Sequence, residues 1–384
     1  MNILLTNYCL DSGTGTEMFL YDLCHELTAR GHQCAVYTTR QGQLVNEFRL
    51  AGISVVDRFA ALPWTPDVLH CQHSLEALEA ISHFMAVPAL YLCHDATAWY
   101  DKAPPASCLE RCLAISIIVR SRVVRDTGLP ISQIGVAFNA VNTRRFACEP
   151  RLRSGDRPEK ALIFHSNLTS NIYKKSIVQA CRELGIQLDE AVYGGSRVIR
   201  APEVELPQYD LVFASGRCAI EAMACGCGVI LAGGAGLGPL VRPGNFFQLR
   251  EANFGQTLLN EQAGTGWIKS EISCLRRREV FEVATLIRRH SNLETLVDYM
   301  LDEYGLIGAM GTQASLPHRQ AIAHSLQIQK QSIEQSLMAR PSHSGELMWI
   351  GLNRFRMALA SLKALDRKST RLNSSHTVIS YAVF

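Results

Sequence analysis

The sequence predicts an α/β protein of two domains, each built on a parallel sheet, with a helical extension at the C-terminal end. Its 384 residues match roughly two ordinary domains. Residues 209–234 read as an apolar strand, a Ser-Gly break, a short helix of small residues, two glycines and a second strand. That order is typical of a βαβ unit in a parallel sheet. Residues 148–160 combine prolines, a glycine and several charges, which indicates a linker between the domains.

Composition also bears on the class of protein and on where it is expected to reside. Hydrophobic residues make up 47% of the chain and charged residues 19%, which suits a globular protein with two cores. The formal net charge of +3 predicts no nucleic-acid partner. No apolar run approaches the ~20 residues that span a bilayer, and Met1–Thr6 lacks the basic region of a signal peptide. The 13 cysteines have no paired Cys-x-x-Cys spacing, so we expect reduced thiols, no metal and a cytoplasmic location.

The first domain is expected to cover residues 1–150. A buried strand at 2–7 is followed by a glycine loop at 11–17, and glycines in such a loop bring backbone amides close to a phosphate. A helix from about 17 to 30 follows, because its apolar residues keep helical spacing. Further strand-like runs lie at 33–39, 52–57, 66–74, 88–97 and 113–119.

One pair of histidines and one histidine–aspartate pair lie near the ends of these strands. His70 and His73 are three residues apart in a strand, which points their side chains to opposite faces and argues against a metal pair. His94 and Asp95 end the run at 88–97, and strand ends of a parallel sheet face the ligand. His94 is therefore a candidate site residue, although a structural role is equally open.

The second domain is expected to cover residues 151–310 and to restart with a strand at 161–166. Lys174 and Lys175 open its first helix, either as phosphate ligands or as a solvated helix start. A strand at 188–193 precedes the central βαβ unit, and residues 265–301 are mainly helical. Residues 245–250 are strand-like.

The central unit carries the strongest chemical signal. Ser215, Gly216 and Arg217 lie at the start of its helix, where free amides and the positive end of the dipole favour a phosphate. Glu221, one turn further on, is suited to accept hydrogen bonds from a ribose diol rather than to bind a phosphate. The alternative is that Glu221 is a solvated helix residue and that the glycines only form turns.

Several motifs resemble one family. The run E-A-M-A-C-G-C-G-V-I, which begins at Glu221, resembles the E-A-M-A-x-G-x-P-V-I segment of the retaining GT-B glycosyltransferases, the large "group 1" family. The glycine loop and the later Arg-Gly-His at 30–32 resemble the opening of these enzymes, and residues 134–146 resemble the end of their first domain. The resemblance implies a GT-B fold, in which an acceptor-side Rossmann-like domain faces a nucleotide-sugar-binding one across a cleft.

The resemblance also implies residue roles. In the family the glutamate binds the donor ribose, the glycine loop and a lysine contact the diphosphate, and a strand-end histidine lies near the sugar. Carried onto this sequence, it implies one catalytic residue, His94, and these substrate-binding residues: Gly13, Gly15, Lys174, Lys175, Ser215, Gly216, Arg217 and Glu221.

The sequence departs from the family at two points. A glutamate usually stands eight positions before the ribose-binding one, and here that position is Phe213. The family arginine after the first strand of the second domain is replaced by Ser166 or Asn167, and Arg217 is placed to supply the missing charge.

The implied activity is transfer of a hexose from a nucleoside diphosphate sugar to a hydroxyl acceptor, with retention at the anomeric carbon. The acceptor would be a glycan or a lipid-linked molecule, and the nucleotide sugar would be a co-substrate with no other cofactor. The alternatives are a nucleotide-sugar epimerase on the same fold and a non-catalytic nucleotide-sugar-binding protein. A bacterial cytoplasmic enzyme is expected, with peripheral contact at the inner membrane face as a variant of this expectation.

The C-terminal part of the chain does not match the two-domain pattern. Residues 311–366 have helical periodicity and are expected to form an appended helical segment of unknown role. Residues 367–384 resemble translated adapter sequence and are expected to be a non-native tail without fold information.

Overall fold

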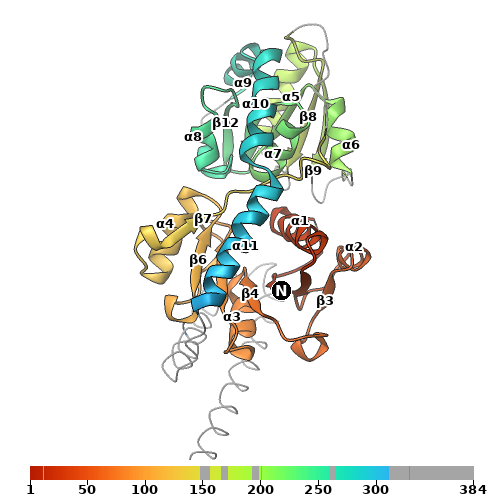
Figure 1. The fold of residues 1–384 in the computed structure, drawn as a ribbon. Helices are drawn as coiled ribbons and strands as arrows, with labels where there is room; N and C mark the ends of the chain where they lie inside the picture. Colours follow the sequence, from red (N-terminus) through yellow and green to blue (C-terminus); the bar gives the residue numbers. More distant parts are fainter. Residues whose placement is uncertain are drawn as a thin grey trace, which may run out of the picture.

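The computed structural model describes residues 1–11, 13–147, 156–165, 172–192, 199, 201–259, 264–310 and 328. The expected helical extension lies outside these residues apart from position 328, and so do the expected tail and most of the expected linker. Two α/β domains make up the described chain. Figure 1 shows the second domain above the first, with α10 along the second domain and α11 along the first. No described helix is long and apolar enough to cross a membrane.

The first domain contains a seven-stranded parallel sheet in the order β3-β2-β1-β4-β5-β6-β7. The order reverses between β1 and β4, and ligands of such sheets bind beyond the carboxyl ends of the strands at this switch. The strands are β1 (Asn2–Thr6), β2 (Gln33–Tyr37), β3 (Ser54–Val56), β4 (Val68–Cys71), β5 (Ala89–Cys93), β6 (Arg111–Ala114) and β7 (Ile134–Val136). The helices between them are α1 (Gly15–Ala29), α2 (Val45–Leu50), α3 (Ser74–His83) and α4 (Ile117–Thr127).

The second domain contains a five-stranded sheet in the order β12-β11-β10-β8-β9, parallel except for β12. Its strands are β8 (Lys160–His165), β9 (Gln187–Val192), β10 (Leu211–Ala214), β11 (Gly228–Gly233) and β12 (Gly236–Leu240). Its helices are α5 (Ile172–Leu184), α6 (Pro202–Glu205), α7 (Gly216–Ala224), α8 (Phe246–Glu251), α9 (Thr265–Ser273) and α10 (Arg277–His290). The predicted βαβ unit is confirmed as β10, α7 and β11, with β10 and β11 paired in parallel.

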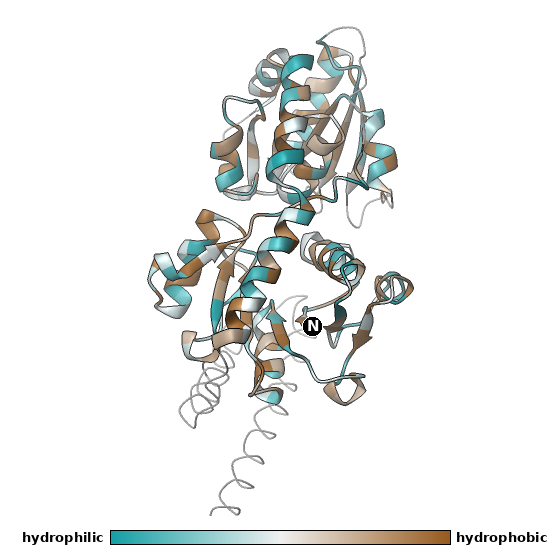
Figure 2. Ribbon diagram, viewed as in Figure 1, coloured by the Kyte–Doolittle hydropathy of each residue, from teal (hydrophilic) through white to brown (hydrophobic). Residues whose placement is uncertain are grey.

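Each sheet has an apolar core on both faces. Figure 2 shows apolar colouring along the strands of both domains, whereas the outer helix α10 alternates between polar and apolar residues. This is the pattern of parallel sheets that are covered by helices on both sides. Because the faces of the sheets are apolar, the polar groups of a site are expected in the loops at the carboxyl ends of the strands.

Two predicted strands are wrong. The run at 113–119 leaves the sheet after Ala114, because Ser116 caps a helix: its Oγ accepts a hydrogen bond from the amide of Val119 at 3.1 Å. Residues 245–250 form α8 instead of a strand, with Phe246 and Leu249 facing the core at helical spacing. In both places an apolar run that fits a strand is equally able to form one face of a short helix.

The last described helix, α11 (Leu293–Met310), returns to the first domain. Its apolar face, including Met300 and Tyr304, belongs to the same core as β1 and α1. The hydroxyl of Tyr304 lies 2.7 Å from Nδ1 of the buried His70, and Arg111 forms an ion pair with Glu303 at 2.7 Å. The domain boundary expected from the sequence, at residue 310, assigns this helix to the second domain, whereas the helix packs against the core of the first domain.

The chain crosses between the domains twice, and the two crossings lie side by side. The amide of Val141 donates to the carbonyl of Ser291 at 2.8 Å, and the amide of Leu293 donates to the carbonyl of Val141 at 3.0 Å. The segment that leaves the first domain is thus paired with the segment that returns to it.

Packing of α11 can be tested with two substitutions in the same helix. Met300 is fully buried and Leu306 is 59% exposed. Met300→Ala should destabilise the first domain by about 2–5 kcal/mol, because it leaves a cavity in the core. Leu306→Ala should change stability by less than about 0.5 kcal/mol. Equal effects of the two substitutions in denaturant unfolding would contradict this packing.

Candidate functional site

The start of α7 lies directly after the carboxyl end of β10. Ser215 is the N-cap in an extended conformation, and Gly216 has a φ of +58°, which favours glycine. The amide of Gly216 donates to the carbonyl of Phe254 at 2.7 Å. This amide, expected to face a phosphate, is therefore used within the protein. The following amides of the first turn have no intrahelical acceptor, because helix geometry provides none.

The loop that accepts from Gly216 has a strained backbone. Asn253 and Phe254 have φ values of 58° and 50°, although neither is glycine. Positive φ at an aromatic residue costs free energy and is kept where surrounding contacts require it. Here Phe254 is buried in the second core, and the Asn253 side chain accepts from the amide of Asn139, beside the domain crossing, at 3.2 Å.

Arg217, Glu221 and Asp22 form a buried ion triad across the domain boundary. Nε of Arg217 lies 2.8 Å from Oε1 of Glu221, one turn further along α7. Its NH2 group binds Oδ2 of Asp22, which lies on α1 of the first domain. All three side chains are less than a tenth exposed. The guanidinium thus neutralises two carboxylates instead of pointing toward an open helix end.

The triad sets the protonation of its members. Burial raises the pKa of Glu221 and Asp22 adds to this, while the charge of Arg217 opposes it. Burial acts to lower the pKa of Arg217, but Asp22 and Glu221 outweigh burial and raise it. Arg145 contributes a second positive field and is itself paired with Glu203 at 2.9 Å. The charges of two cations therefore oppose the rise in the pKa of Glu221.

One oxygen of Glu221 remains available. Oε1 binds Arg217, whereas Oε2 accepts no hydrogen bond from the described residues. It is also absent from the set of fully enclosed unpartnered atoms, so it keeps some access to solvent. A carboxylate can accept on both oxygens at once. Glu221 can consequently stay paired with Arg217 and still accept from a ligand hydroxyl.

The glycine loop before α1 is organised around Glu17. This carboxylate is fully buried, and its Oε2 accepts from the amide and the hydroxyl of Thr14, both at 2.7 Å. Its Oε1 accepts from the amide of Asp11 at 2.5 Å. Gly13 has a φ of +69°, and nothing lies within 4 Å of a Cβ placed on Gly15. Open space at Gly15 lets a ligand approach the backbone there.

His94 follows β5, and its ring makes an edge contact with Phe19 of α1, with ring centroids 5.0 Å apart. Its Nε2 is enclosed and has no hydrogen-bond partner among the described residues. Burial, with smaller effects of His73 and His70, lowers its pKa well below the usual value. His94 is therefore neutral at physiological pH, and it retains one nitrogen for a ligand.

His73 is a site candidate that sequence reasoning missed. It lies beyond the end of β4 at the cap of α3, with a φ of 62°, rather than within a strand as expected. Its Nδ1 accepts from the amide of Tyr8 at 2.8 Å, and burial lowers its pKa to about 3. A neutral imidazole that accepts on Nδ1 carries its proton on Nε2. This N–H donor has no partner among the described residues. The feature that could have indicated His73 as a site residue is its position at the β1/β4 switch.

The two lysines are not part of this group. Nζ of Lys174 binds Oε1 of Glu190 on the edge strand β9 at 2.5 Å, and Lys175 is exposed. Among the described residues no three His, Cys, Asp or Glu side chains are placed to hold a metal ion. The structure therefore links His94 and the ion triad through their contacts with α1, and the His73 ring lies 6.4 Å from that of His94. Lys174 and Lys175 make no such contact among the described residues.

Comparisons with known proteins bear on the fold. No protein-family model matches the sequence, and no curated protein matches it. Among solved structures, HepE from Anabaena in complex with UDP and glucose aligns with a TM-score of 0.55 at 14% identity, over 79% of this chain and 99% of that one. A glycosyltransferase from Rickettsia africae aligns with a TM-score of 0.57 at 15% identity, over 80% of this chain and 98% of that one.

The chain has the GT-B fold. Its two Rossmann-like domains match the two-domain architecture expected from the sequence, with one parallel sheet and one that is parallel except for β12. The identities are low, so these similarities concern the fold alone.

Removal of Arg217 would test the triad. Arg217→Met should destabilise the protein by about 3–5 kcal/mol, because it leaves Asp22 and Glu221 buried without their cation. Glu221 would then lose the cation that opposes the rise of its pKa, so the loss should shrink as the pH falls toward about 4. Arg278→Met, in an exposed helical pair, is the matched control and should change stability by less than about 0.5 kcal/mol. A loss that does not depend on pH would contradict this electrostatic account.

Asp101 gives a second pH-dependent expectation. Burial raises the pKa of its carboxyl to about 7, although it accepts hydrogen bonds from the amides of His94 and Asp95. A raised carboxyl pKa contributes stability that is complete below about pH 4 and is lost as the pH rises through 7. The difference in unfolding free energy between the wild type and Asp101→Asn should therefore fall between pH 4 and pH 8. A difference that grows with pH would contradict it.

Proposed function

We propose that this chain is a glycosyltransferase that moves a sugar from a nucleoside diphosphate sugar to a hydroxyl acceptor, with retention. The observation that carries the proposal is the position of Glu221. This carboxylate of the E-A-M-A motif lies one turn into α7, at the domain boundary, with Oε2 free of hydrogen bonds from described residues. The GT-B fold and the UDP and glucose bound to HepE support the proposal.

In this proposal Glu221 accepts hydrogen bonds from the donor ribose through Oε2. The first turn of α7, beginning at Ser215 and Gly216, and the glycine loop at Gly13 and Gly15 supply amides to the diphosphate. Arg217 keeps Glu221 ionised and contributes its field to the leaving group. Stabilisation of the leaving diphosphate by amides and cations lowers the barrier without a side-chain nucleophile.

His94 is proposed to lie beside the transferred sugar, with His73 as a neighbouring hydrogen-bond donor. Both imidazoles are neutral and each keeps Nε2 for a ligand, which suits recognition of sugar hydroxyls more than binding of phosphate. Lys174 would reach the diphosphate only by leaving Glu190. The hexose type, a glycan or lipid-linked acceptor, and a cytoplasmic site with peripheral membrane contact are parts of the same proposal.

A non-catalytic nucleotide-sugar-binding protein is the second candidate. It is favoured by Phe213, which stands at the position of the family's first glutamate, belongs to β10 and is fully buried in the core. The phenylalanine ring cannot supply the carboxylate that the family has at this position. The epimerase alternative has no such observation in its favour.

Calorimetric titration of the full chain with UDP, GDP and ADP tests the donor site. One nucleotide should bind, and Glu221→Ala should weaken it roughly ten- to a hundred-fold, because a hydrogen bond to a charged group is worth about 1.5–3 kcal/mol. Glu282→Ala on α10 is the control and should bind like the wild type. Failure of all three nucleotides to bind would refute the site.

Turnover separates the two candidate functions. A transferase consumes its nucleotide sugar faster when an acceptor extract is present, and it releases the nucleoside diphosphate. A binding protein would retain the same nucleotide affinity, yet the donor would stay intact with every extract.

A further inference from the structure

Three aromatic side chains gather at the carboxyl ends of β1 and β5. We call Tyr8, Trp99 and Tyr100 the aromatic platform. Tyr8 and Tyr100 are stacked, with ring centroids 5.6 Å apart and planes 6° apart. Trp99 is nearly perpendicular to both, at 6.4 Å from Tyr8 and 5.7 Å from Tyr100. The platform therefore joins the loop that follows β1 to the loop that follows β5, which is separated from β1 by β4 alone.

The platform leaves the surface of Trp99 uncovered. One face of Tyr8 is covered by Tyr100, and the guanidinium of Arg40 lies over the ring at 4.8 Å while it donates to the Tyr8 hydroxyl at 2.6 Å. Tyr8 must therefore meet Trp99 through its edge. Trp99 is 39% exposed, which is a large fraction for a residue held by two aromatic neighbours. An indole supported on one side in this way presents an aromatic surface to solvent.

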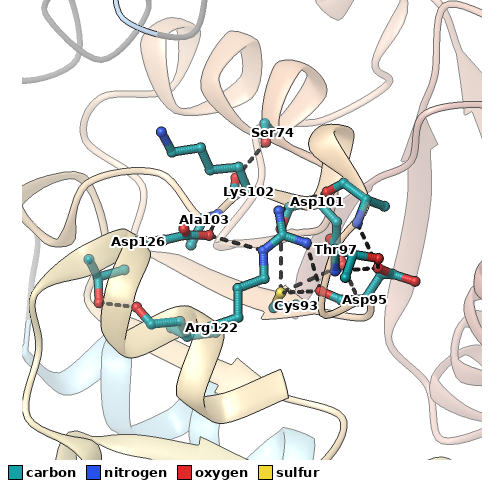
Figure 3. A network of polar contacts seen from close by, with 12 residues as sticks. Ser74, Cys93, Asp95, Thr97, Asp101, Lys102, Ala103, Arg122 and Asp126 are labelled. Atoms are coloured by element: carbon teal, nitrogen blue, oxygen red, sulfur yellow. Dashed lines mark hydrogen bonds and ion pairs between the residues drawn. The ribbon is translucent and has the colours of Figure 1, made fainter. Parts of the chain in front are cut away.

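The loop that carries Trp99 is held rigidly. Oδ1 of Asp95 accepts from the amides of Thr97 and Ala98, both at 2.6 Å. Arg122 donates to the carbonyls of Asp95 and Ala98 at 2.8 and 2.7 Å, and it is less than a tenth exposed. Figure 3 shows this network, in which Arg122 reaches from α4 into the loop. A loop fixed in advance loses little entropy when it binds a ligand.

The same network connects the platform to the proposed sugar site. The buried Asp101 accepts from the amides of His94 and Asp95, so it fixes both the histidine and the start of the loop. His73 lies 5.3 Å from the Tyr100 ring in an edge contact, and it binds the amide of Tyr8. The platform therefore adjoins the unpartnered Nε2 of His73.

We propose that the aromatic platform binds a saccharide ring of the acceptor, with Trp99 as the stacking residue. This rests on the proposed function and narrows its acceptor to a glycan, or to the sugar part of a lipid-linked one. A sugar ring has an apolar C–H face for the indole and hydroxyls at its edge. Arg40 and His73 contact the platform, and Asp95 lies in the loop that carries Trp99, so charged and hydrogen-bonding groups of the kind that such hydroxyls need are close to it.

Other occupants fit less well. An acyl chain favours a contiguous apolar surface, whereas the loop that carries Trp99 also contains Asp95 and Lys102. A nucleotide base stacks on tryptophan too, but then the platform would bind the donor nucleotide, which is a testable difference.

Saturation-transfer NMR on the full chain with cellobiose, lactose, maltose and chitobiose tests the proposal. At least one disaccharide should bind, and Trp99→Ala should weaken it about tenfold or more, with substantial recovery in Trp99→Phe. Phe281→Ala, which removes a 55% exposed ring from α10, is the matched control and should have no effect. UDP affinity should be the same in all three variants.

Each opposite result is informative. Disaccharide binding that survives Trp99→Ala, or no disaccharide binding to the wild type, overturns the platform as a sugar site. A loss of UDP affinity in Trp99→Ala assigns the platform to the nucleotide base instead. If UDP, GDP and ADP all fail to bind while a disaccharide binds through Trp99, the platform stands and the proposed transferase function fails.

Discussion

The domain arrangement depends on one buried group of charges. Arg217 contacts both Asp22 and Glu221 in it. Two carboxylates from different domains share one guanidinium, and all three are shielded from water. Such a group is costly to bury and costly to break, so it fixes the register of α1 against α7 more than it adds stability. It also holds Glu221 in one orientation, with Oε1 occupied and Oε2 directed elsewhere. The proposed ribose contact depends on that orientation.

The polar groups of the first domain obey a related constraint. His73, His94 and Glu17 are all buried at the carboxyl ends of strands, where the sheet supplies no partners for their side chains. Glu17 accepts from loop amides, whereas Nε2 of each histidine has no hydrogen-bond partner among the described residues. A buried polar atom without a partner costs free energy, so its retention points to a ligand-facing role. The positive φ of His73 adds backbone strain at the same place.

The sequence predicted the features that depend on local pattern. The β10–α7–β11 unit was found because apolar runs, small residues and glycines occur at fixed spacing within about 25 residues. The return of α11 to the first domain was not predictable, because its amphipathic pattern does not say which core it covers. Likewise, the partner of Arg217 is Asp22, 195 residues away in sequence, and only folding brings the two together. His73 was misjudged because the strand was expected to run to residue 74, three residues beyond its end at Cys71.

The most direct test of the account is a crystal structure of the full chain with UDP. The account predicts ribose hydroxyls within hydrogen-bond distance of Glu221 Oε2, the diphosphate at the first turn of α7, and Arg217 still bound to Oε1. UDP bound at another edge of either sheet, or bound at α7 without contact to Glu221, would contradict the central claim that this carboxylate anchors the donor.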